Sequence, residues 1–319
     1  MKASEHGVRA IGVKELAADA LKSNPHNPRL LFDREDMTVL RGSIARVGIL
    51  VPLTVYREER TRDYIILDGQ RRWMCAKDVG LKKIPVNEVA EPTLVQNIVT
   101  MFQIHKLRKD WELMPTALKL ELLMRELDEK KEKRLAELTG LDEAVVVRCK
   151  KLLSYNKRYQ DMMLDADPDH RVKADFFIEL YPVRNDRVVK NFPWFKKDKF
   201  TDDMLKKVDA KGLKAVTDFR IIKQHINNAA KARKVQLISK KLREFAEQPD
   251  LTPDHLNIES ARVAADAKKV LTATDKLYAQ INAIDVDQFF GEDAMWSRLE
   301  TLAKLIRSKL RQLGRRVEE

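Results

Sequence analysis

Cysteine is scarce in this sequence, and its scarcity limits the chemistry that the chain can carry. The 319 residues include two cysteines, Cys75 and Cys149, each among apolar neighbours on an expected helix. Such cysteines favour a reduced, cytoplasmic compartment over a disulfide framework. Neither has the CxxC or Cys/His spacing of a zinc site, so we expect no structural metal.

Long apolar runs are also missing. No uninterrupted apolar stretch approaches the roughly 18 residues that cross a bilayer, and the N-terminal MKASEHGVRA lacks the apolar centre of a signal peptide. We therefore expect no membrane association. The sequence shows no internal repeat, and its 44% hydrophobic content over 319 residues is sufficient for two or three domains with real cores.

Positive charge is plentiful but unevenly distributed. The formal net charge is +12, and residues 196–243 hold 15 Lys and Arg against 5 Asp and Glu, a net +10. Apolar residues recur there at helical spacing, with the cations between them. Two interpretations stay open: a solvated helix face, or a helix along nucleic-acid phosphates that would use Lys231, Arg233 and Lys234.

Residues 65–86, which read IILDGQRRWMCAKDVGLKKIPV, contain the most informative turn. A β-run ends at Asp68 and Gly69, and a helix follows directly with Arg71 and Arg72 in its first turn. Backbone N–H groups at a helix N-terminus have no intrahelical partner, so they favour an anion, and arginines add donor forks for phosphate oxygens. The alternative is an ordinary turn glycine followed by solvated arginines.

The hydrophobic pattern indicates an α+β region followed by helices. We expect strands at 53–56, 64–67 and 84–89 and helices at 36–47 and 70–79 in a first domain, residues 1–105. A helical domain, residues 106–170, and a helical C-terminal region, residues 171–319, follow. Residues 165–170 and the proline-containing 181–194 are expected to be connectors, with helix breaks at 248–250 and near Gly291.

Residues 131–155 have the layout of a helix-turn-helix. Leu135 and Ala136 lie on the first helix, Gly140 makes the turn, and Val146 with Cys149 packs the second helix against the first. The outward face of the second helix would then present to DNA the side chains of Glu143, Val147, Arg148 and Lys151. Asp142 could be an N-cap that satisfies backbone amides, and the helix pair could be scaffolding alone.

Three spaced motifs together carry a family resemblance. Residues 24–29 read NPHNPR, residues 43–55 read SIARVGILVPLTV, and the Gly-Gln-Arg-Arg turn and the helix-turn-helix follow. This order resembles the ParB family of chromosome and plasmid partition proteins, whose N-terminal fold is similar to that of sulfiredoxins. The resemblance implies a CTP-binding domain, a dimeric clamp that closes around DNA, and a helix-turn-helix that loads the clamp. The resemblance is also compatible with a partition ATPase as a protein partner.

The resemblance also assigns site residues by position. The family's CTP pocket uses the GIxxPxxV segment, the GERR turn and an ENxxR motif. The matching positions here are Gly48, Ile49, Pro52, Gly69, Gln70, Arg71, Arg72, Gln103, His105 and Lys106. For His105, the alternative is a packed surface residue near the domain junction.

Three residues depart from the family pattern, and two of them replace carboxylates that catalysis would use. Gln70 replaces the GERR glutamate, and an amide cannot act as a general base. Phe102 replaces the ENxxR glutamate that helps to hold magnesium, and it cannot ligate a hard cation. Val51 stands where many relatives have glutamine, which affects the fit to the base. We therefore assign no catalytic residue, leave magnesium open, and expect CTP binding with weak or absent hydrolysis.

Alternative functions remain at this point. Loss of nucleotide control would leave a nucleotide-independent transcriptional regulator with a ParB-type fold, and a nuclease or small-molecule kinase could use the same fold. Heptad-like apolar residues between Ala261 and Leu313 predict a homodimer contact, although they could instead pack within one chain.

Overall fold

The computed structural model describes residues 8–27, 34–105, 112–285 and 288–315. The chain divides into two compact units, Met1–Arg220 and Ile221–Glu319. The domain boundaries expected at 105/106 and 170/171 both fall inside the first unit and stay predictions. Across the described ranges, no helix has the length and apolar character needed to cross a bilayer.

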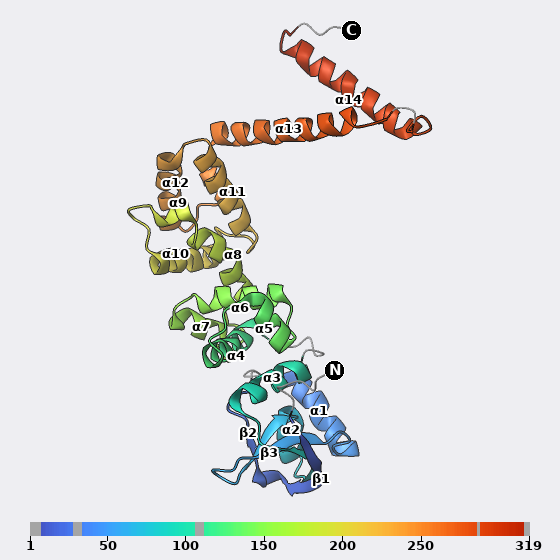
Figure 1. The fold of residues 1–319 in the computed structure, drawn as a ribbon. Helices are drawn as coiled ribbons and strands as arrows, with labels where there is room; N and C mark the ends of the chain where they lie inside the picture. The colour runs from blue at the N-terminus through green and yellow to red at the C-terminus, as the bar shows by residue number, and fades with distance from the viewer. Residues whose placement is uncertain (1–7, 28–33, 106–111, 286–287, 316–319) are drawn as a thin grey trace. The chain divides into compact units, whose positions relative to one another are not determined.

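A five-stranded mixed sheet forms the centre of the N-terminal domain (Figure 1, blue to cyan). Its order is β1-β5-β3-β4-β2. The pairs β1/β5 and β3/β4 are antiparallel, whereas β3/β5 and β2/β4 are parallel. The strands are β1 Ala10–Ala17, β2 Leu21–Ser23, β3 Leu53–Arg57, β4 Tyr64–Asp68 and β5 Lys83–Val89, with a 3-10 turn, η1, at Ala18–Ala20.

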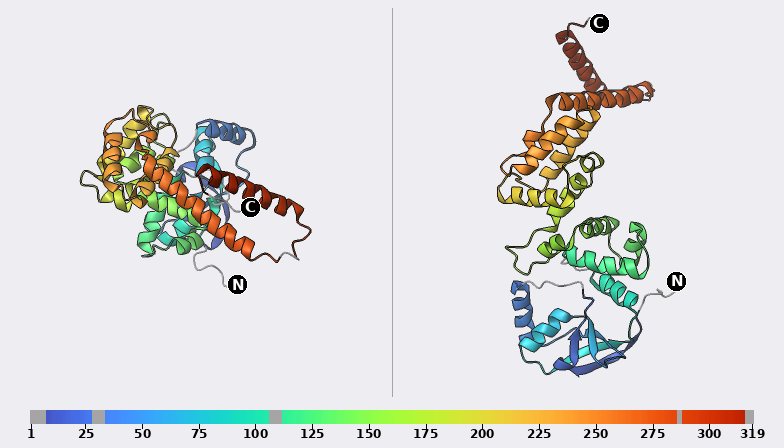
Figure 2. Two further views of the ribbon diagram at one scale, coloured as in Figure 1. Left: turned by 90° about the horizontal axis from the view of Figure 1, so that it is seen from above. Right: turned by 90° about the vertical axis from the view of Figure 1, so that its left-hand side faces the viewer.

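Helices α1 Arg34–Val47 and α2 Gln70–Asp78 share a core with one face of this sheet (Figure 2). That core contains Met37 and Ile44 from α1, Cys75 and Ala76 from α2, and inward residues of the strands such as Leu53. Strand residues alternate between faces, so a second cluster, Tyr56, Ile65, Leu67 and Val89, lies on the opposite face. Helix α3, Leu94–His105, contacts β4.

A helix-turn-helix lies within the following helices. Leu135 of α5 and Val146 and Cys149 of α6 are fully buried, the two helices contact each other, and Gly140 ends α5 with a left-handed φ of 73°. The expected packing of this motif is confirmed. The helices are α4 Leu113–Glu126, α5 Glu132–Thr139, α6 Glu143–Leu153, α7 Lys157–Met163, α8 Ala174–Arg184 and α9 Arg187–Lys190.

The remaining helices are more exposed towards the C-terminus. They are α10 Lys197–Asp209, α11 Asp218–Lys231, α12 Val235–Glu247, a 3-10 turn η2 at Pro253–Leu256, α13 Glu259–Asn282 and α14 Asp293–Gln312. Both figures draw α13 as one long, uninterrupted helix. Ala261 is the single buried residue of α13 as described, and α14 has none in its described span.

Most expected elements match the structure, and the α+β class is confirmed. The three predicted strands and the helices at 36–47 and 70–79 correspond to β3, β4, β5, α1 and α2, and the breaks near 248–250 and Gly291 also hold. One prediction was wrong. Residues 181–194 are not simply a connector, because Tyr181–Arg184 is the last turn of α8 and α9 follows. Pro182 is tolerated in that turn.

Candidate functional site

The turn before α2 requires glycine at position 69. Gly69 has a left-handed φ of 97°, and a Cβ there would lie 2.7 Å from Leu53 Cγ and 3.0 Å from Arg72 Nη2. Real Cβ atoms are essentially never that close to a neighbour. The chain therefore turns from β4 into α2 in a space that only a residue without a side chain can fill.

Arg72 ties this turn to the segment before β3. Its Nη2 donates to Asp68 Oδ2 at 2.9 Å, and its Nη1 donates to the backbone carbonyls of Val51 and Pro52, the latter at 3.2 Å. The Arg72 side chain is mostly buried. Its guanidinium thus donates to the protein's own acceptors and links two motifs, whereas the sequence predicted that it would donate to phosphate oxygens.

Gln70 connects the turn to the first motif. Its Oε1 accepts a hydrogen bond of 2.6 Å from Asn27 Nδ2. Pro28 and Arg29, which complete that motif, lie outside the described residues. Together, the hydrogen bonds of Gln70 and Arg72, which span 43, 21 and 20 residues of sequence, bring three segments to one place beside Gly69.

Arg71 differs from its neighbour in its surroundings. It contacts Asp36 of α1 at 3.5 Å, and the Asp36 carboxylate is 60% exposed. The Arg71 side chain is 22% exposed. A pair with one largely exposed partner at this distance stabilises by at most about 1 kcal/mol, so an incoming phosphate could compete for Arg71. The first-turn amides of α2 lie at the positive end of the helix dipole, which adds to that attraction.

Gly48 and Ile49 lie where α1 ends. Gly48 has a φ of 70°, and its N–H donates to Ile44 O at 2.9 Å, which closes the helix. Ile49 packs against the core shared by α1, α2 and the sheet. The Pro52 carbonyl accepts from Arg72, so this expected segment adjoins the turn.

A buried polar chain lies next to the first motif and was not predicted as part of the site. Asn24 Nδ2 donates to Asn97 Oδ1 at 2.9 Å, and Asn97 Nδ2 donates to the Tyr56 hydroxyl at 3.4 Å. Burial, more than the nearby carboxylates of Glu58 and Glu91, raises the pKa of Tyr56 to about 12. The sequence signal was Asn97 within the apolar LVQNIVTMF, because a polar residue among apolar ones needs a partner.

The third expected element provides one described side chain to the surface. Gln103 is exposed on α3, whereas Phe102 is 1% exposed and belongs to the core. Lys106 and the side chain of His105 lie outside the described residues. Among the residues whose placement is described, no group of three or more His, Cys, Asp or Glu side chains could hold a metal ion.

Lysine 119 of α4 links the helical domain to the first motif. Its Nζ donates to the Pro25 carbonyl at 3.2 Å, and burial lowers the pKa of Lys119. Burial also lowers the pKa of His26, and the charge of Lys119 adds to that effect. The motif is therefore anchored from α4 as well as from α3.

Of the four expected DNA-facing residues of α6, two are exposed and the other two interact with side chains of α8. Glu143 and Val147 are exposed. Arg148 Nη2 pairs with Asp175 Oδ1 of α8 at 2.6 Å, and Lys151 Nζ lies 5.8 Å from the centre of the Tyr181 ring. Asp142 is the N-cap residue of α6, as the alternative interpretation had it, but its side chain makes no capping hydrogen bond to the backbone amides.

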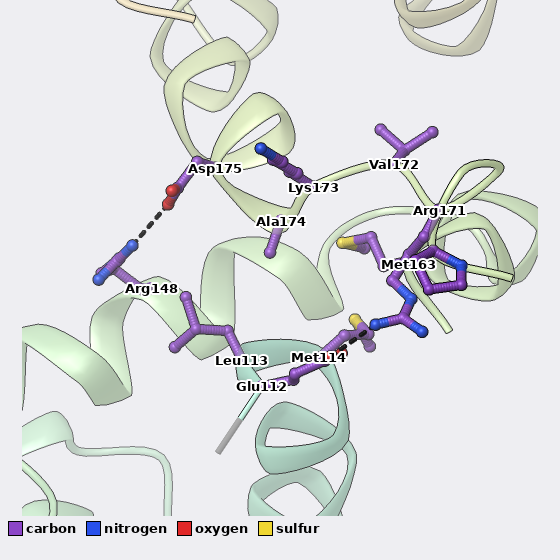
Figure 3. Close-up of a pocket in the computed structure, with 11 residues that line it drawn as sticks. Glu112, Leu113, Met114, Arg148, Met163, Arg171, Val172, Lys173, Ala174 and Asp175 are labelled. Carbon is purple, nitrogen blue, oxygen red and sulfur yellow. Dashed lines mark hydrogen bonds and ion pairs between the residues drawn. The ribbon is translucent and has the colours of Figure 1, made fainter. Parts of the chain in front are cut away.

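A pocket of about 470 Å³ lies beside Arg148 (Figure 3). Two ion pairs border it: Arg148 with Asp175, and Arg171 Nη1 with Glu112 Oε1 at 2.6 Å. Met114, Met163 and Val172 supply apolar lining. Both arginines of the pocket are paired with carboxylates, and Lys173 adds one further positive charge to the lining.

The basic residues predicted in the C-terminal region lie around the end of α11. Lys231 is its last residue, and Arg233 and Lys234 lie in the turn before α12. All three are exposed. Arg233 has a left-handed φ of 58°, which a turn of this kind accommodates at some cost for a residue other than glycine.

Comparisons with known proteins agree on one family. The ParB N-terminal domain family matches residues 2–102. The chromosome-partitioning protein ParB of Caulobacter vibrioides is 27% identical over 164 residues, 49% of this chain and 51% of that protein. Stage 0 sporulation protein J of Bacillus subtilis is 30% identical over 156 residues, 48% of this chain and 53% of that protein. The chain thus matches about half the length of these curated relatives.

The similarity of this chain to solved structures is low by TM-score. C-terminally truncated ParB from Caulobacter crescentus, complexed to the centromeric parS site, has a TM-score of 0.40 at 21% identity and covers 65% of this chain and 96% of that one. The same protein complexed with CTP-gamma-S has a TM-score of 0.29 at 24% identity and covers 54% and 98%. Residues 2–102 match the ParB N-terminal domain family, so this part of the chain is a ParB N-terminal domain.

Proposed function

We propose that the chain is a DNA-binding protein of plasmid or chromosome partition whose N-terminal domain binds CTP and thereby controls a clamp on DNA. The observation that carries this proposal is the meeting of three family motifs at Gly69. Arg72 joins the turn to Val51 and Pro52, and Gln70 joins it to Asn27. Such cross-links pre-organise a site, which reduces the cost of ordering it when a ligand binds.

The chemistry of the turn supports a triphosphate as the ligand. The first-turn amides of α2 supply donors and a positive dipole, and Gly69 lets the backbone approach the ligand closely. Arg71 adds a guanidinium whose partner, Asp36, is largely exposed. In this proposal Arg71 contacts phosphate oxygens and Arg72 holds the turn in shape. Gly48, Ile49 and Pro52 would form the adjoining wall, with Gln103, His105 and Lys106 at the third family position.

The residues present fit a triphosphate better than a protein-held metal. Phe102, at the position of the family's magnesium-binding glutamate, is buried and offers no oxygen ligand. Gln70 Oε1 already accepts from Asn27, and an amide cannot take up a proton from water. We therefore propose weak or absent CTP hydrolysis, with any magnesium held mainly by the nucleotide.

DNA binding is assigned to the helix-turn-helix and to the basic end of α11. Glu143, Val147, Arg148 and Lys151 of α6 are the proposed groove-facing residues, and Lys231, Arg233 and Lys234 are proposed phosphate contacts. The family relationship and the chain's net charge of +12 support this role. The similarity to chromosome-partitioning proteins is the sole support for a partition ATPase as a further proposed partner.

A homodimer is proposed through the C-terminal helices. On α13, Val263, Val270 and Leu277 recur every seven residues, and Ala267, Thr274 and Ile281 occupy the intervening positions; we call these six residues the apolar stripe. Val263 is 57% and Val270 is 66% exposed. A heptad pattern left open in this way is what a second helix covers in a coiled coil.

The second candidate is a nucleotide-independent DNA-binding regulator. The specific observation in its favour is that Arg72 and Gln70 are engaged within the protein, which would stabilise the turn without any nucleotide. The two candidates differ in one measurable property, the affinity for CTP.

The test is isothermal calorimetry of the full chain with each of the four nucleoside triphosphates, with and without magnesium. We expect CTP to bind most tightly, Arg71→Gln to weaken it at least tenfold, and Asp36→Asn to leave it unchanged or tighter. Arg41→Gln is the matched control, because Arg41 carries the same charge on α1 but pairs with Asp78. Absence of CTP binding at millimolar concentration would favour the regulator.

A further inference from the structure

A larger cavity lies farther along the first unit, and no family motif lines it. It has a volume of about 750 Å³ and is formed by the end of α7 and the segment after it, the start of α8, the end of α10 and the loop that leads into α11. Sites for small organic ligands measure about 300–1,000 Å³ and are mostly apolar. The cavity therefore has the size of a ligand site, and its lining includes none of the proposed nucleotide-binding or DNA-binding residues.

Two phenylalanines make the floor of this cavity, which we call the phenylalanine cavity. Phe176 and Phe219 are 3% and 1% exposed, and their ring centroids lie 5.3 Å apart at an interplanar angle of 76°. Leu213, which also lines the cavity, is 5% exposed. Aromatic rings prefer edge-to-face and offset-stacked neighbours, so this floor suits a ligand that brings a further ring.

Apolar side chains also surround the opening of the cavity. Met162, Val208 and Val216 come from three separate segments and are 36%, 43% and 36% exposed. A single exposed apolar residue is common on a protein surface, but a group of them around a cavity is typical of a binding site. The apolar lining therefore runs from the buried floor to the surface.

The charged residues of the lining favour an anion. Apart from His170, three cations stand against two carboxylates: Arg171, Lys173, Lys214, Asp169 and Asp209. Arg171 is already paired with Glu112. In the part of the chain that the structure describes, the ammonium groups of Lys173 and Lys214 have no ion-pair or hydrogen-bond partner. These two lysines are therefore the cations available to a ligand.

Side-chain length decides which of these charges can reach a ligand. A lysine ammonium stands at the end of a flexible four-carbon stem, so it can fold over the opening while its charge stays in water. An aspartate carboxylate is attached directly to Cβ and stays close to its own backbone. Lys173 precedes α8 and Lys214 precedes α11, so an anionic group at the opening is attracted from two parts of the lining.

From these observations we infer that the phenylalanine cavity binds a small organic anion with an aromatic body. The body lies against Phe176 and Phe219, and the anionic group lies at the opening near Lys173 and Lys214. This inference goes beyond the proposed function and depends on neither CTP binding nor DNA binding.

The position of the cavity gives such a ligand a route to the helix-turn-helix. Arg171, Val172 and Lys173 line both this cavity and the pocket beside Arg148 that Figure 3 shows. The same segment leads into Asp175, the carboxylate that pairs with Arg148 of α6. The ligand would therefore contact the segment that places the partner of a proposed DNA-facing arginine.

The experiment titrates the full chain with two fluorescent probes that share the same rings. Anilinonaphthalene sulfonate carries an anionic group, whereas phenylnaphthylamine is uncharged. We expect the sulfonate to bind more tightly. Lys173→Gln/Lys214→Gln should weaken the sulfonate at least about fivefold and change the uncharged probe by less than about twofold. Lys206→Gln/Lys211→Gln is the matched control, because it removes the same charge from exposed positions that do not line the cavity.

A second pair of variants tests the location of the site. Ala215 is exposed and lines the cavity, so Ala215→Trp should fill it and remove one site for both probes. Ala210→Trp adds the same ring at an exposed position outside the lining and should leave that site intact. All of the substituted side chains are exposed, so circular dichroism should show unchanged folding.

Three outcomes would overturn the inference: sulfonate binding that survives Ala215→Trp, an equal loss in either control, or equal affinity of the wild type for the two probes. Displacement of the sulfonate by CTP would assign the cavity to the nucleotide and would also reject it. Calorimetry with CTP on Lys173→Gln/Lys214→Gln keeps the proposals apart. Normal CTP binding with unchanged sulfonate binding would reject only the phenylalanine cavity.

Discussion

Helices α4 and α13 differ in how far their apolar residues are buried. Helix α4, in the first unit, buries Met114, Ala117, Leu120 and Leu123 against its neighbours. Helix α13, in the second unit, is longer but buries only Ala261 among its described residues. The first helix is covered by its own chain, whereas Val263 and Val270 in the apolar stripe of the second are 57% and 66% exposed. We therefore propose that the stability of α13 depends on association, whereas that of α4 depends on folding alone.

The two helices should differ most in the stability that is lost when one leucine of each is changed to alanine. Leu120 is fully buried, so Leu120→Ala should reduce the free energy of unfolding by about 2–5 kcal/mol. Leu271 is 61% exposed on α13, so Leu271→Ala should reduce the free energy of unfolding by less than about 0.5 kcal/mol. Urea denaturation followed by circular dichroism measures both. Equal losses would contradict the comparison.

A charge in the apolar stripe should break association without unfolding the chain. Val270→Asp places a carboxylate where the second helix would pack, and we expect at least a tenfold weaker dimer in analytical ultracentrifugation. Gln280→Asp adds the same charge to α13 outside the stripe and serves as the control. If wild type sediments as a monomer at all concentrations, the apolar stripe has a different partner.

Alanine substitutions at Gly69 and Gly80 separate two costs within the first unit, that of a left-handed φ and that of a steric clash. Gly69→Ala should destabilise by at least about 1–3 kcal/mol, because it combines a left-handed φ with a clash against Leu53. Gly80 has a φ of 78° but nothing within 4 Å of its added Cβ, so Gly80→Ala reports the conformational cost alone. Thermal unfolding of both variants isolates the cost of the clash, and equal losses would mean that Leu53 moves aside.

The smallest expected effect is a pH dependence shared by both units. Burial is the main cause that lowers the pKa of His26 in the first unit and of His225 in the second below the ordinary 6.5. As pH falls through 6.5, the unfolded chain binds a proton before the folded one, so stability is lost between 6.5 and the lowered folded value. His26→Gln and His225→Gln should each flatten part of this loss in denaturation series between pH 7.5 and 5. An unaltered profile in both would mean that other groups cause it.

The sequence was informative about local structure and less so about pairing. Short apolar runs located β3 and β4, because both faces of these strands contribute buried residues. Strand β1 was not predicted: its residues are mostly exposed, and it is defined by pairing with β5, about 70 residues later in the chain. Such pairing leaves little trace in a local window.

Within the candidate site, the sequence predicted which segments matter but not how they join. A turn at Gly69 followed from its place between a strand and a helix, whereas its left-handed φ was not predicted. The engagement of Arg72 could not be foreseen, because two of its acceptors are backbone carbonyls 20 and 21 residues earlier in the chain. Likewise, the hydrogen bond between Asn27 and Gln70 depends on the folding of the sheet between them.

The most direct test of the nucleotide switch is retention of the full chain on closed circular DNA, compared with linear DNA, in the presence and absence of CTP. We predict that CTP raises retention on the circle alone, that Arg71→Gln abolishes this rise, and that Arg41→Gln preserves it. Equal retention with and without CTP in the wild type would contradict the proposal that the Gly69 turn controls a clamp.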